Sequence, residues 1–263
     1  MADTILEEIA AKTRERVAAA KRREPPAEME RRARALGAQT GFPFEAALRG
    51  KDIAFICEVK KASPSKGVIA LEFPYRQIAL DYEAAGAAAV SVLTEPAYFQ
   101  GADAYLSDIA AAVGIPVLRK DFTVDSYMIY EARTLGAAAV LLIAALLDGD
   151  TLRDYIGVAH SLGLSALVEA HTAEETEVAV KAGARIIGVN NRDLRTFQVD
   201  TGNCLRLRPL VPRSVLFVAE SGVRTAADID RLRAGGVDAV LVGETLMRAP
   251  DRKAALAALR GTP

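Results

Sequence analysis

The sequence predicts an α/β protein in which eight strand–helix units close into a barrel behind an N-terminal helical extension. A glycine followed by a mostly apolar run recurs about every 50 residues, at Gly86, Gly136, Gly183 and Gly236. Each glycine is placed to end a helix, and the run behind it suits a strand buried on both faces. Three more apolar runs lie between these phrases, and the run at 53–59 completes the eight. Eight such units in 263 residues predict a (β/α)8 TIM barrel.

A doubly wound open sheet is the competing α/β architecture. It more often has about five to seven strands and a glycine-rich phosphate turn after the first strand. No G-x-G-x-x-G motif follows the run at 53–59. We therefore expect a single TIM-barrel domain over residues 1–263, with residues 1–50 as an extension packed on the barrel and residues 51–263 as eight βα units.

Composition restricts the partner to a small molecule. The net charge is −1, and lysines and arginines are interspersed with acids, so the chain has no basic tract for nucleic acid. No window approaches the roughly 20 apolar residues of a membrane span, and the N-terminus lacks the apolar block of a signal peptide. We expect a small-molecule substrate, no nucleic acid, no membrane, and a monomer or weak homo-oligomer.

The cysteines and histidines point to the cytoplasm and away from a metal site. Cys57 lies in a predicted strand and Cys204 in a predicted helix, without the spacing of a paired motif, which favours a reducing compartment and inert thiols. His160 and His171 belong to no cluster with metal-ligand spacing. We expect a cytoplasmic protein without a bound metal.

The extension reads as three helices, over residues 3–21, 27–36 and 44–49. Apolar residues recur at helical spacing in the first, and Asp3 or Thr4 can cap it. The Pro25-Pro26 pair stops it. Its basic residues are most simply a face in contact with water: Lys12, Arg14, Arg16, Lys21, Arg22 and Arg23.

The first predicted strand of the barrel carries charge on one face. Alternate residues of a strand share a face, so Ile56, Glu58 and Lys60 point one way, and Phe55 and Cys57 point the other. Two charges buried in a parallel sheet each cost several kcal/mol unless they are paired or given a polar cavity. Two interpretations remain at this point, a surface strand in water or a cavity at the end of a buried strand.

Polar residues stand at the carboxyl ends of five predicted strands, where barrel enzymes place their sites. They share parity with inward apolar residues, as Lys120 does with Leu118 and Glu169 with Leu167. Strands that merely run into polar loops would end in residues of arbitrary type and parity. The inward set is Glu58, Lys60, Lys120, Glu169, Asn190 and Glu220. Lysines offset carboxylates in this set, which makes its burial tolerable and suits acid/base chemistry.

Two glycine-bearing turns follow the seventh and eighth strands, at Ser221-Gly222 and Gly243-Glu244. Barrels commonly bind phosphate there, because backbone N–H groups and a helix dipole both favour an anion. Glycines after strands are also ordinary turn residues. The Glu244 carboxylate would repel phosphate, so we expect that residue to contribute its backbone only.

Three further features allow both a functional and a plain interpretation. The loop 62–67 after the first strand is either a lid over the ligand or a simple connection. Tyr98 and Phe99 either flank an aromatic ligand or cover the barrel mouth, and we include Phe99 among the substrate-binding candidates. His171 is more simply a loop or cap residue than a catalyst.

Six motifs together resemble the indole-3-glycerol phosphate synthase family, whose barrel enzymes close the indole ring in tryptophan biosynthesis. They are C-E-V-K-K-A-S-P-S-K-G, P-V-L-R-K-D-F, A-L-V-E-A-H, G-V-N-N-R-D-L, A-E-S-G-V and L-V-G-E-T-L-M-R. The resemblance covers residues 42–249 in the family's order and spacing, and the extension matches the one this family adds to its barrel. E-V-K-x-x-S-P-S and N-N-R-D-L are specific, whereas E-S-G alone is shared with other barrels.

The resemblance implies the substrate 1-(2-carboxyphenylamino)-1-deoxyribulose 5-phosphate, which loses carbon dioxide and water as a ring carbon attacks the ribulose carbonyl, without a cofactor. It implies that Lys120 is the general acid at the carbonyl oxygen and Glu169 the general base. Glu58 and Asn190 then support proton transfer and orientation. Lys60 binds the ligand, and whether it is also an acid in the dehydration stays open.

The remaining matches of the resemblance concern contacts to the substrate. Glu220 matches a further active-site carboxylate, and Arg192 belongs to the turn that recognises the anthranilate end. The residues implied to surround the phosphate are Ser63, Ser221, Gly222 and Gly243. Glu244 departs from members that carry Ser, which puts a hydroxyl contact to phosphate in doubt. Ala102-Asp103 departs from a frequent small hydroxyl residue, away from the proton chemistry.

Three alternative functions stay open at this point. The first two are another phosphate-binding barrel of the same pathway, such as phosphoribosylanthranilate isomerase, and an aldolase. An isomerase needs an acid and a base but not two inward lysines, and an aldolase lysine would form a Schiff base. The third is a non-catalytic phosphate-ligand binder, which would leave Lys120 and Glu169 without a task.

Overall fold

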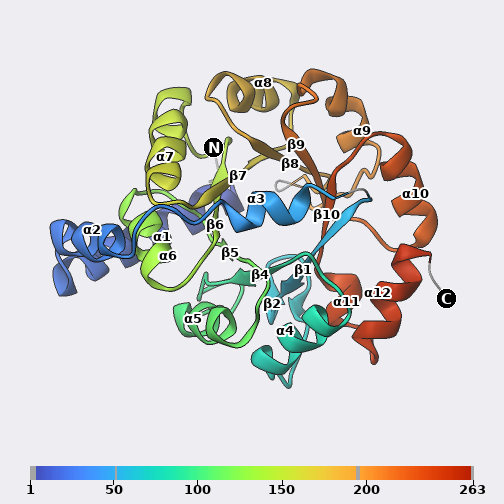
Figure 1. Ribbon diagram of the computed structural model, residues 1–263, viewed down its shortest axis with the longest axis horizontal. Coiled ribbons are helices and arrows are strands. Elements are labelled where there is room, and N and C mark those ends of the chain that lie inside the picture. The colour runs from blue at the N-terminus through green and yellow to red at the C-terminus, as the bar shows by residue number, and fades with distance from the viewer. Residues whose placement is uncertain (1–3, 51, 194–195, 262–263) are drawn as a thin grey trace.

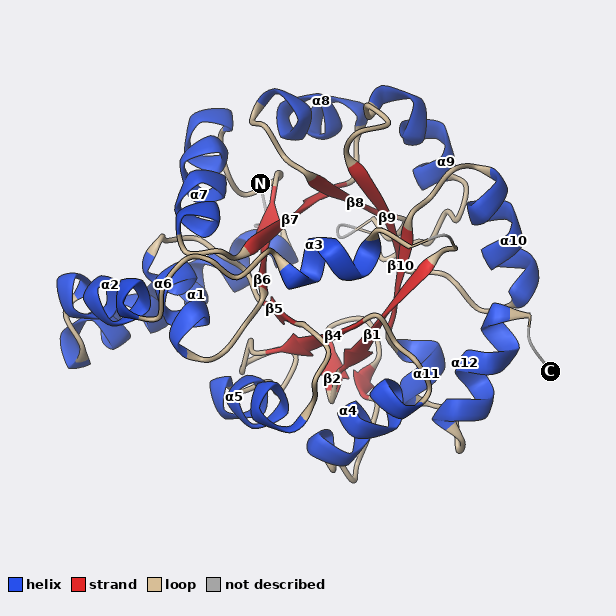
Figure 2. Ribbon diagram, viewed as in Figure 1, coloured by secondary structure: helices blue, strands red, loops and turns tan. Residues whose placement is uncertain are grey.

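The computed structural model describes residues 4–50, 52–193 and 196–261. Eight parallel strands form a closed barrel with helices outside it, which confirms the predicted TIM barrel (Figure 1, Figure 2). Around the barrel the order is β1-β10-β9-β8-β7-β6-β5-β4. The barrel strands are β1 (Ala54–Val59), β4 (Ala89–Leu93), β5 (Val117–Lys120), β6 (Ala139–Ile143), β7 (Ser165–Ala170), β8 (Ile186–Asn190), β9 (Leu216–Glu220) and β10 (Ala239–Val242).

Helices precede the first strand and cross over between the others. Those of the extension are α1 (Ile5–Arg23), α2 (Pro26–Ala35) and α3 (Pro43–Leu48). The others are α4 (Tyr75–Ala84), α5 (Asp103–Ala112), α6 (Tyr127–Thr134), α7 (Gly149–Ser161), α8 (Ala173–Lys181), α9 (Asn203–Leu207), the 3-10 helix η1 (Arg208–Leu210), α10 (Ala226–Ala234), α11 (Glu244–Met247) and α12 (Arg252–Arg260). The recurring glycines have φ of 75° to 87°, as expected just after helix ends: Gly86, Gly136, Gly183 and Gly236.

The two faces of each strand bury different sets of apolar residues. Ile56, Leu118 and Leu167 pack inside the barrel, whereas Phe55 and Cys57 pack against the outer helices. The predicted parity of the strands is therefore confirmed. It matters for the site, because a residue two positions beyond an inward apolar residue also points into the barrel.

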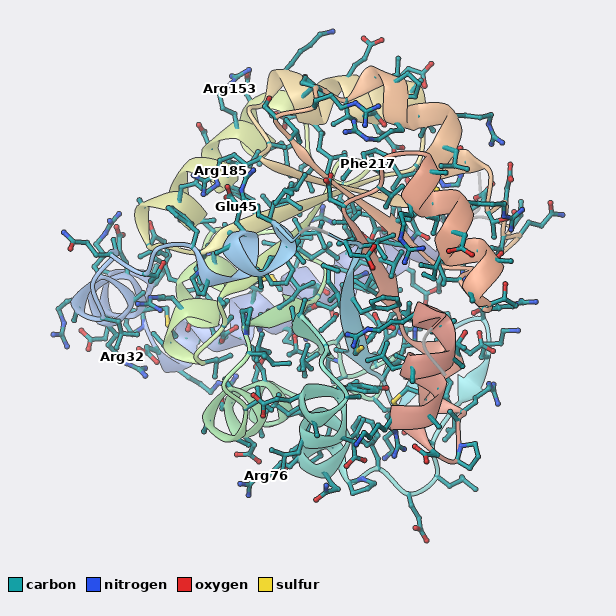
Figure 3. All side chains as sticks on the ribbon, turned by 45° about the vertical axis from the view of Figure 1, so that its right-hand side comes forward. Arg32, Glu45, Arg76, Arg153, Arg185 and Phe217 are labelled. Atoms are coloured by element: carbon teal, nitrogen blue, oxygen red, sulfur yellow. The ribbon has the colours of Figure 1, made fainter. Side chains whose placement is uncertain are left out.

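The extension contacts both ends of the barrel. Thr4 caps α1 in a capping box with Glu7, while the alternative cap Asp3 lies outside the described residues. At the other end of the extension, α3 lies across the amino-terminal end of the barrel (Figure 2), where it buries Phe44 and Leu48 among the interior residues. An ion pair of 3.0 Å joins its Glu45 to Arg185, just before β8 (Figure 3).

The interpretation of the basic α1 residues as a solvated face is wrong for two of them. Arg16 contacts both carboxylate oxygens of the buried Asp121 at 2.8 Å, and Lys21 pairs with Asp125 at 2.6 Å. Both acids follow β5. Helical periodicity identifies the apolar face of α1, but it carries no information on which carboxylates the fold brings opposite the other face.

A short antiparallel hairpin in the loop after β1 was not expected from the sequence. It consists of β2 (Ala62–Ser63) and β3 (Gly67–Val68). The backbone N–H of Ala62 donates to the carbonyl of Phe99 at 3.2 Å, which links the hairpin to the loop after β4. Within the described residues, no helix is both long and apolar enough to cross a membrane.

Candidate active site

A cavity of about 440 Å³ opens at the carboxyl ends of the barrel strands. Parallel strands bring these ends to one rim, so residues far apart in the chain meet there. All thirteen candidate residues line it: Glu58, Lys60, Ser63, Phe99, Lys120, Glu169, Asn190, Arg192, Glu220, Ser221, Gly222, Gly243 and Glu244. The structure therefore brings the candidates together, and the role of each stays a prediction.

Lys120 lies at the centre of the charged cluster. Its Nζ donates to Glu169 Oε2 at 3.1 Å and lies 3.6 Å from Glu220 Oε2. Asn190 donates its side-chain amide to the other oxygen of Glu169 at 3.1 Å. The Glu169 carboxylate is therefore held from two sides, with one oxygen on the ammonium and one on the amide.

Burial and neighbouring charges shift the pKa values of Lys120, Glu169 and Glu220 in different directions. Burial opposes the Lys120 ammonium, but Glu169, Glu220 and Glu58 outweigh that cost, so the pKa of Lys120 is raised. Burial also opposes the Glu169 carboxylate, but Lys120 and Asn190 prevail and lower its pKa. For Glu220, burial and repulsion by Glu169 act together and raise its pKa to about 8. At neutral pH the cluster thus holds a protonated lysine, an ionised Glu169 and a Glu220 that retains its proton.

Gly188 makes room for Glu220, and the sequence analysis did not identify it. This glycine lies on β8 at the level of Glu169 on β7. A Cβ on Gly188 would collide with Glu220 Oε1 and would lie 3.1 Å from Leu167 Cδ1. The sequence did contain a signal for this role. Gly188 lies two positions before Asn190 and so shares its inward face, and a glycine inside an apolar strand often marks a close approach of another group.

A second charged pair lies on the β1 side of the cavity. Lys60 forms an ion pair with Glu58, and both side chains are mostly buried. Gly243, at the end of β10, faces this pair, because a Cβ there would collide with Glu58 Oε1 and lie 3.1 Å from Lys60 Nζ. A side chain at Gly243 would therefore disturb the β1 pair as well as the adjacent turn.

The turn after β9 has an unusual backbone. Ser221 has φ of 66° and Gly222 has φ of 86°. A positive φ is uncommon for a residue other than glycine, and outliers of this kind cluster at ligand sites. The Asn191 side chain supports the turn by donating to the Ser221 carbonyl at 3.1 Å.

The Glu244 side chain is engaged by cations and not by the backbone of the turn. Its Oε1 lies 3.7 Å from Lys66 Nζ of the hairpin loop and accepts from Arg248 Nε at 3.2 Å. Glu244 begins the short helix α11, whose first backbone N–H groups have no partner within the helix.

The loop after β8 holds Arg192. Its backbone N–H donates to the Asn190 side chain at 2.9 Å and its guanidinium to the Phe197 carbonyl at 3.2 Å. The last residue of the N-N-R-D-L motif, Leu194, lies outside the described residues. Arg192 therefore supplies a positive charge to the cavity from the same strand end as Asn190.

Apolar residues also line the cavity. The rings of Phe99 and Phe122 lie 5.9 Å apart. The remaining apolar lining residues that the sequence analysis did not identify include Ile5, Leu6 and Ile9 of α1 and Leu141 and Ile143 of β6. Helical spacing identified the α1 residues as apolar, but it did not indicate that they would cover a ligand site.

Three residues of the sequence analysis lie apart from the cavity. His171 donates from Nδ1 to the Asn190 carbonyl at 2.7 Å, and its backbone N–H donates to Glu175, so it is a loop residue as predicted. Cys57 and Cys204 are buried and unpaired. Burial raises the pKa of Cys57 to about 12 and also raises that of Cys204. In the part of the chain that the structure describes, no group of three His, Cys, Asp or Glu side chains could hold a metal ion.

Comparison with known proteins identifies relatives over almost the full chain. The family profile of indole-3-glycerol phosphate synthase matches residues 6–259. The indole-3-glycerol phosphate synthase of Ruminiclostridium cellulolyticum is 57% identical over 258 residues, which cover 98% of this chain and 99% of that protein. The protein of the same name from Endomicrobium trichonymphae is 54% identical over 244 residues, or 93% of this chain and 95% of that protein.

Solved structures of more distant proteins share the fold alone. A 3-hexulose-6-phosphate synthase from Salmonella typhimurium has a TM-score of 0.65 at 13% identity and covers 80% of this chain and 97% of its own. A thiamine phosphate pyrophosphorylase from Pyrococcus furiosus has a TM-score of 0.59 at 19% identity and covers 81% of this chain and 96% of its own.

Proposed function

The chain belongs to the indole-3-glycerol phosphate synthase family, and on this basis we propose that Lys120 is its ring-closing acid and Glu169 its base. Members of this family are carboxy-lyases. They close the indole ring of 1-(2-carboxyphenylamino)-1-deoxyribulose 5-phosphate in tryptophan biosynthesis. The observation that carries this assignment is the 3.1 Å contact between the two side chains in the cavity. The roles of the other lining residues follow from their positions around this pair.

The first step joins the anthranilate ring to the sugar. The ring carbon that bears the carboxylate attacks the ribulose carbonyl carbon, and the carbonyl electron pair moves to oxygen. Lys120 gives its proton to that oxygen, which becomes a hydroxyl. Its raised pKa keeps the proton available until negative charge develops. Carbon dioxide then leaves, and its bonding electrons return to the ring.

The second step removes water and makes the new five-membered ring aromatic. The new hydroxyl leaves with a proton as water, while a proton is taken from the intermediate to form the indole double bond. The ionised Glu169 carboxylate is the acceptor that we assign, because Asn190 and Lys120 hold it in place without protonating it. Lys60 is a candidate donor to the leaving hydroxyl, and it forms an ion pair with Glu58.

The two charged ends of the substrate are assigned to opposite features of the cavity. We place the phosphate at the turns of Ser221-Gly222 and Gly243-Glu244, near the start of α11, with Ser63 beside it. We place the anthranilate carboxylate near Arg192, with Phe99 against the aromatic ring. Glu220, which retains its proton near neutral pH, adds no second full negative charge beside Glu169.

Turnover of the aminodeoxyribulose phosphate by Lys120→Met tests the acid role. The variant keeps much of the length of the side chain and loses the proton, so kcat should fall by about 10² to 10⁴, the usual contribution of a general acid. Borohydride with substrate should trap no covalent adduct on the parent protein. Near-parent kcat in the variant, or a trapped lysine, would favour the aldolase-like alternative instead.

The cell compartment and the assembly state extend this proposal. We expect a cytoplasmic enzyme that is a monomer or a weak homo-oligomer and that binds no nucleic acid. Light scattering after gel filtration at several concentrations tests the assembly state, and a stable oligomer across dilution would contradict it. Fractionation of the native cells tests the compartment.

A further inference from the structure

Arg16 of α1 contacts the side chain of the residue that directly follows Lys120. Its Nη2 lies 2.8 Å from both carboxylate oxygens of Asp121, the residue directly after Lys120, and its Nη1 donates to the Thr94 carbonyl at 3.3 Å. The Asp121 side chain is fully buried, whereas that of Arg16 is 26% exposed. The N-terminal extension therefore places a charged side chain directly behind the proposed acid.

Thr94 joins this contact to Lys120 itself. Its backbone N–H donates to the Lys120 carbonyl at 3.2 Å, and its hydroxyl donates to Asp121 at 2.5 Å. The same hydroxyl accepts from Arg119 Nε at 3.2 Å. Thr94 thus contacts Arg16, Asp121, Arg119 and the backbone of Lys120 at once, so a shift of Arg16 would be transmitted to the end of β5.

The network continues to the outer helices through Arg119. This buried guanidinium contacts Asp103 of α5 at 2.7 Å and Glu131 of α6 at 2.8 Å. Asp103 belongs to the Ala102-Asp103 pair, where a small hydroxyl residue is frequent in the family, and here it is an ion-pair partner. The β5 end is therefore held by α5 and α6 on one side and by α1 on the other.

Loss of Arg16 would leave the buried Asp121 carboxylate, next to the acid, with one cation fewer. Asp121 is fully buried, and burial opposes its charge, but Arg16 and Arg119 prevail and lower its pKa. A buried carboxylate deprived of one of its two cations must protonate, move or admit water. Each of these changes would shift the backbone on which Lys120 is mounted.

We propose that Arg16 is a positioning residue for the ring-closing step, which holds Lys120 in its productive place through Asp121 and Thr94. The inference rests on the acid role assigned to Lys120 above. It gives the N-terminal extension a function in the chemistry, separate from covering the cavity with Ile5, Leu6 and Ile9.

Arg16→Ala and chemical rescue test the proposal. A displacement of a catalytic group by about 1 Å can cost on the order of 10²-fold, so kcat should fall by about 10- to 100-fold with a much smaller change in KM. Free guanidinium at low millimolar concentration should restore part of kcat by occupying the vacated position. Guanidinium only weakens a protein whose fold has been loosened, so a purely structural role would give no rescue.

Lys21→Met is the matched control on the same helix. Lys21 ties α1 to the same loop through Asp125 at 2.6 Å, but Asp125 does not adjoin Lys120. If Arg16 only anchored α1, both variants should lower kcat alike and neither should respond to guanidinium. That result, or near-parent kcat in Arg16→Ala, would overturn the proposal. Arg16→Lys keeps the charge and should retain intermediate activity, which provides a test should the alanine variant not fold.

A double variant tests the positioning role of Arg16 separately from the acid role of Lys120. In the Lys120→Met background, Arg16→Ala should cost little further kcat, because Arg16 acts through a group already removed. A full multiplicative loss would place the action of Arg16 elsewhere and overturn the inference alone. Near-parent kcat in Lys120→Met would instead overturn the acid role.

Discussion

The two ends of the barrel are built from the same strands but filled by opposite kinds of residue. At the amino-terminal end, Ala54, Leu216 and Ala239 fill the interior and α3 plugs it with Phe44 and Leu48, each at most 8% exposed. At the carboxyl end the inward positions carry lysines, carboxylates and an amide. The apolar end needs only close packing, whereas each charge at the other end needs a partner. Substitutions at the two ends should therefore affect different properties.

The largest expected effect is on catalysis at the charged end. Glu169→Gln keeps the shape of the side chain and removes the base, so kcat should fall by about 10² to 10⁴. Combined with Lys120→Met, the loss should be far less than multiplicative, because both residues serve one reaction. Steady-state kinetics of the single and double variants measure this. Multiplicative losses would show that the two residues contribute independently and do not act as a unit.

Deletion of residues 1–45 should have the next largest effect, because it removes elements from both ends of the barrel. It takes away α1 from the cavity and Phe44 from the plug, and a buried Phe alone contributes about 3–5 kcal/mol. We expect lower thermal stability and lower activity, because we propose that the extension and the barrel fold as one domain. A truncated protein as stable and as active as the parent would make the extension a dispensable tail.

Leu48→Ala tests the apolar end alone. Leu48 is 1% exposed, and truncation of a buried leucine costs about 2–5 kcal/mol. Urea unfolding should show this loss, while kcat at a temperature where the variant stays folded should match the parent. A large fall in kcat without loss of stability would contradict the division between the two ends.

Gly243→Asp tests the phosphate turn and should have a more moderate effect. It adds a like charge beside the phosphate, so KM should rise by at least about tenfold, or about 1.4 kcal/mol. The new side chain also reaches Glu58, so kcat should fall as well. Inhibition by inorganic phosphate separates the effect on phosphate binding from the effect on Glu58. Inorganic phosphate should still inhibit the Glu58→Gln variant, but it should no longer inhibit Gly243→Asp. Unchanged inhibition in Gly243→Asp would remove phosphate from this turn.

The last expected effect is the dependence of stability on pH through Glu220. Its pKa is about 8 in the folded protein, against about 4.3 for an ordinary glutamate in the unfolded chain. Between these values the folded state binds the additional proton, so the free energy of unfolding falls as the pH rises. Glu169, whose pKa is lowered, acts below this window.

Glu220→Gln should flatten this slope and should be more stable than the parent near pH 8. The charges of Glu169 and Lys120 both act on Glu220, so the substitution also changes the pKa of these two neighbours. Urea unfolding of both proteins across the window measures the difference. Parallel pH profiles would show that Glu220 does not hold its proton in the folded state.

The charged end was accessible to sequence analysis because strand parity is local. Two residues along a strand return to the same face, so Lys120 follows from Leu118 and Glu169 from Leu167 without any knowledge of their neighbours. The order of the repeats then brings all strand ends to one rim. The same reasoning missed the hairpin β2–β3, whose strands of two residues are too short to show a period.

The barrel, the direction of each inward side chain and the family therefore follow from the sequence, because these depend on local periodicity and on motifs. The contacts between elements follow only from the closed barrel: Gly188 leaves space for Glu220, Arg16 pairs with Asp121, and burial beside Glu169 raises the pKa of Glu220. Distances between side chains on different elements set these properties. A pattern along one chain does not contain those distances, because they arise only when the barrel closes.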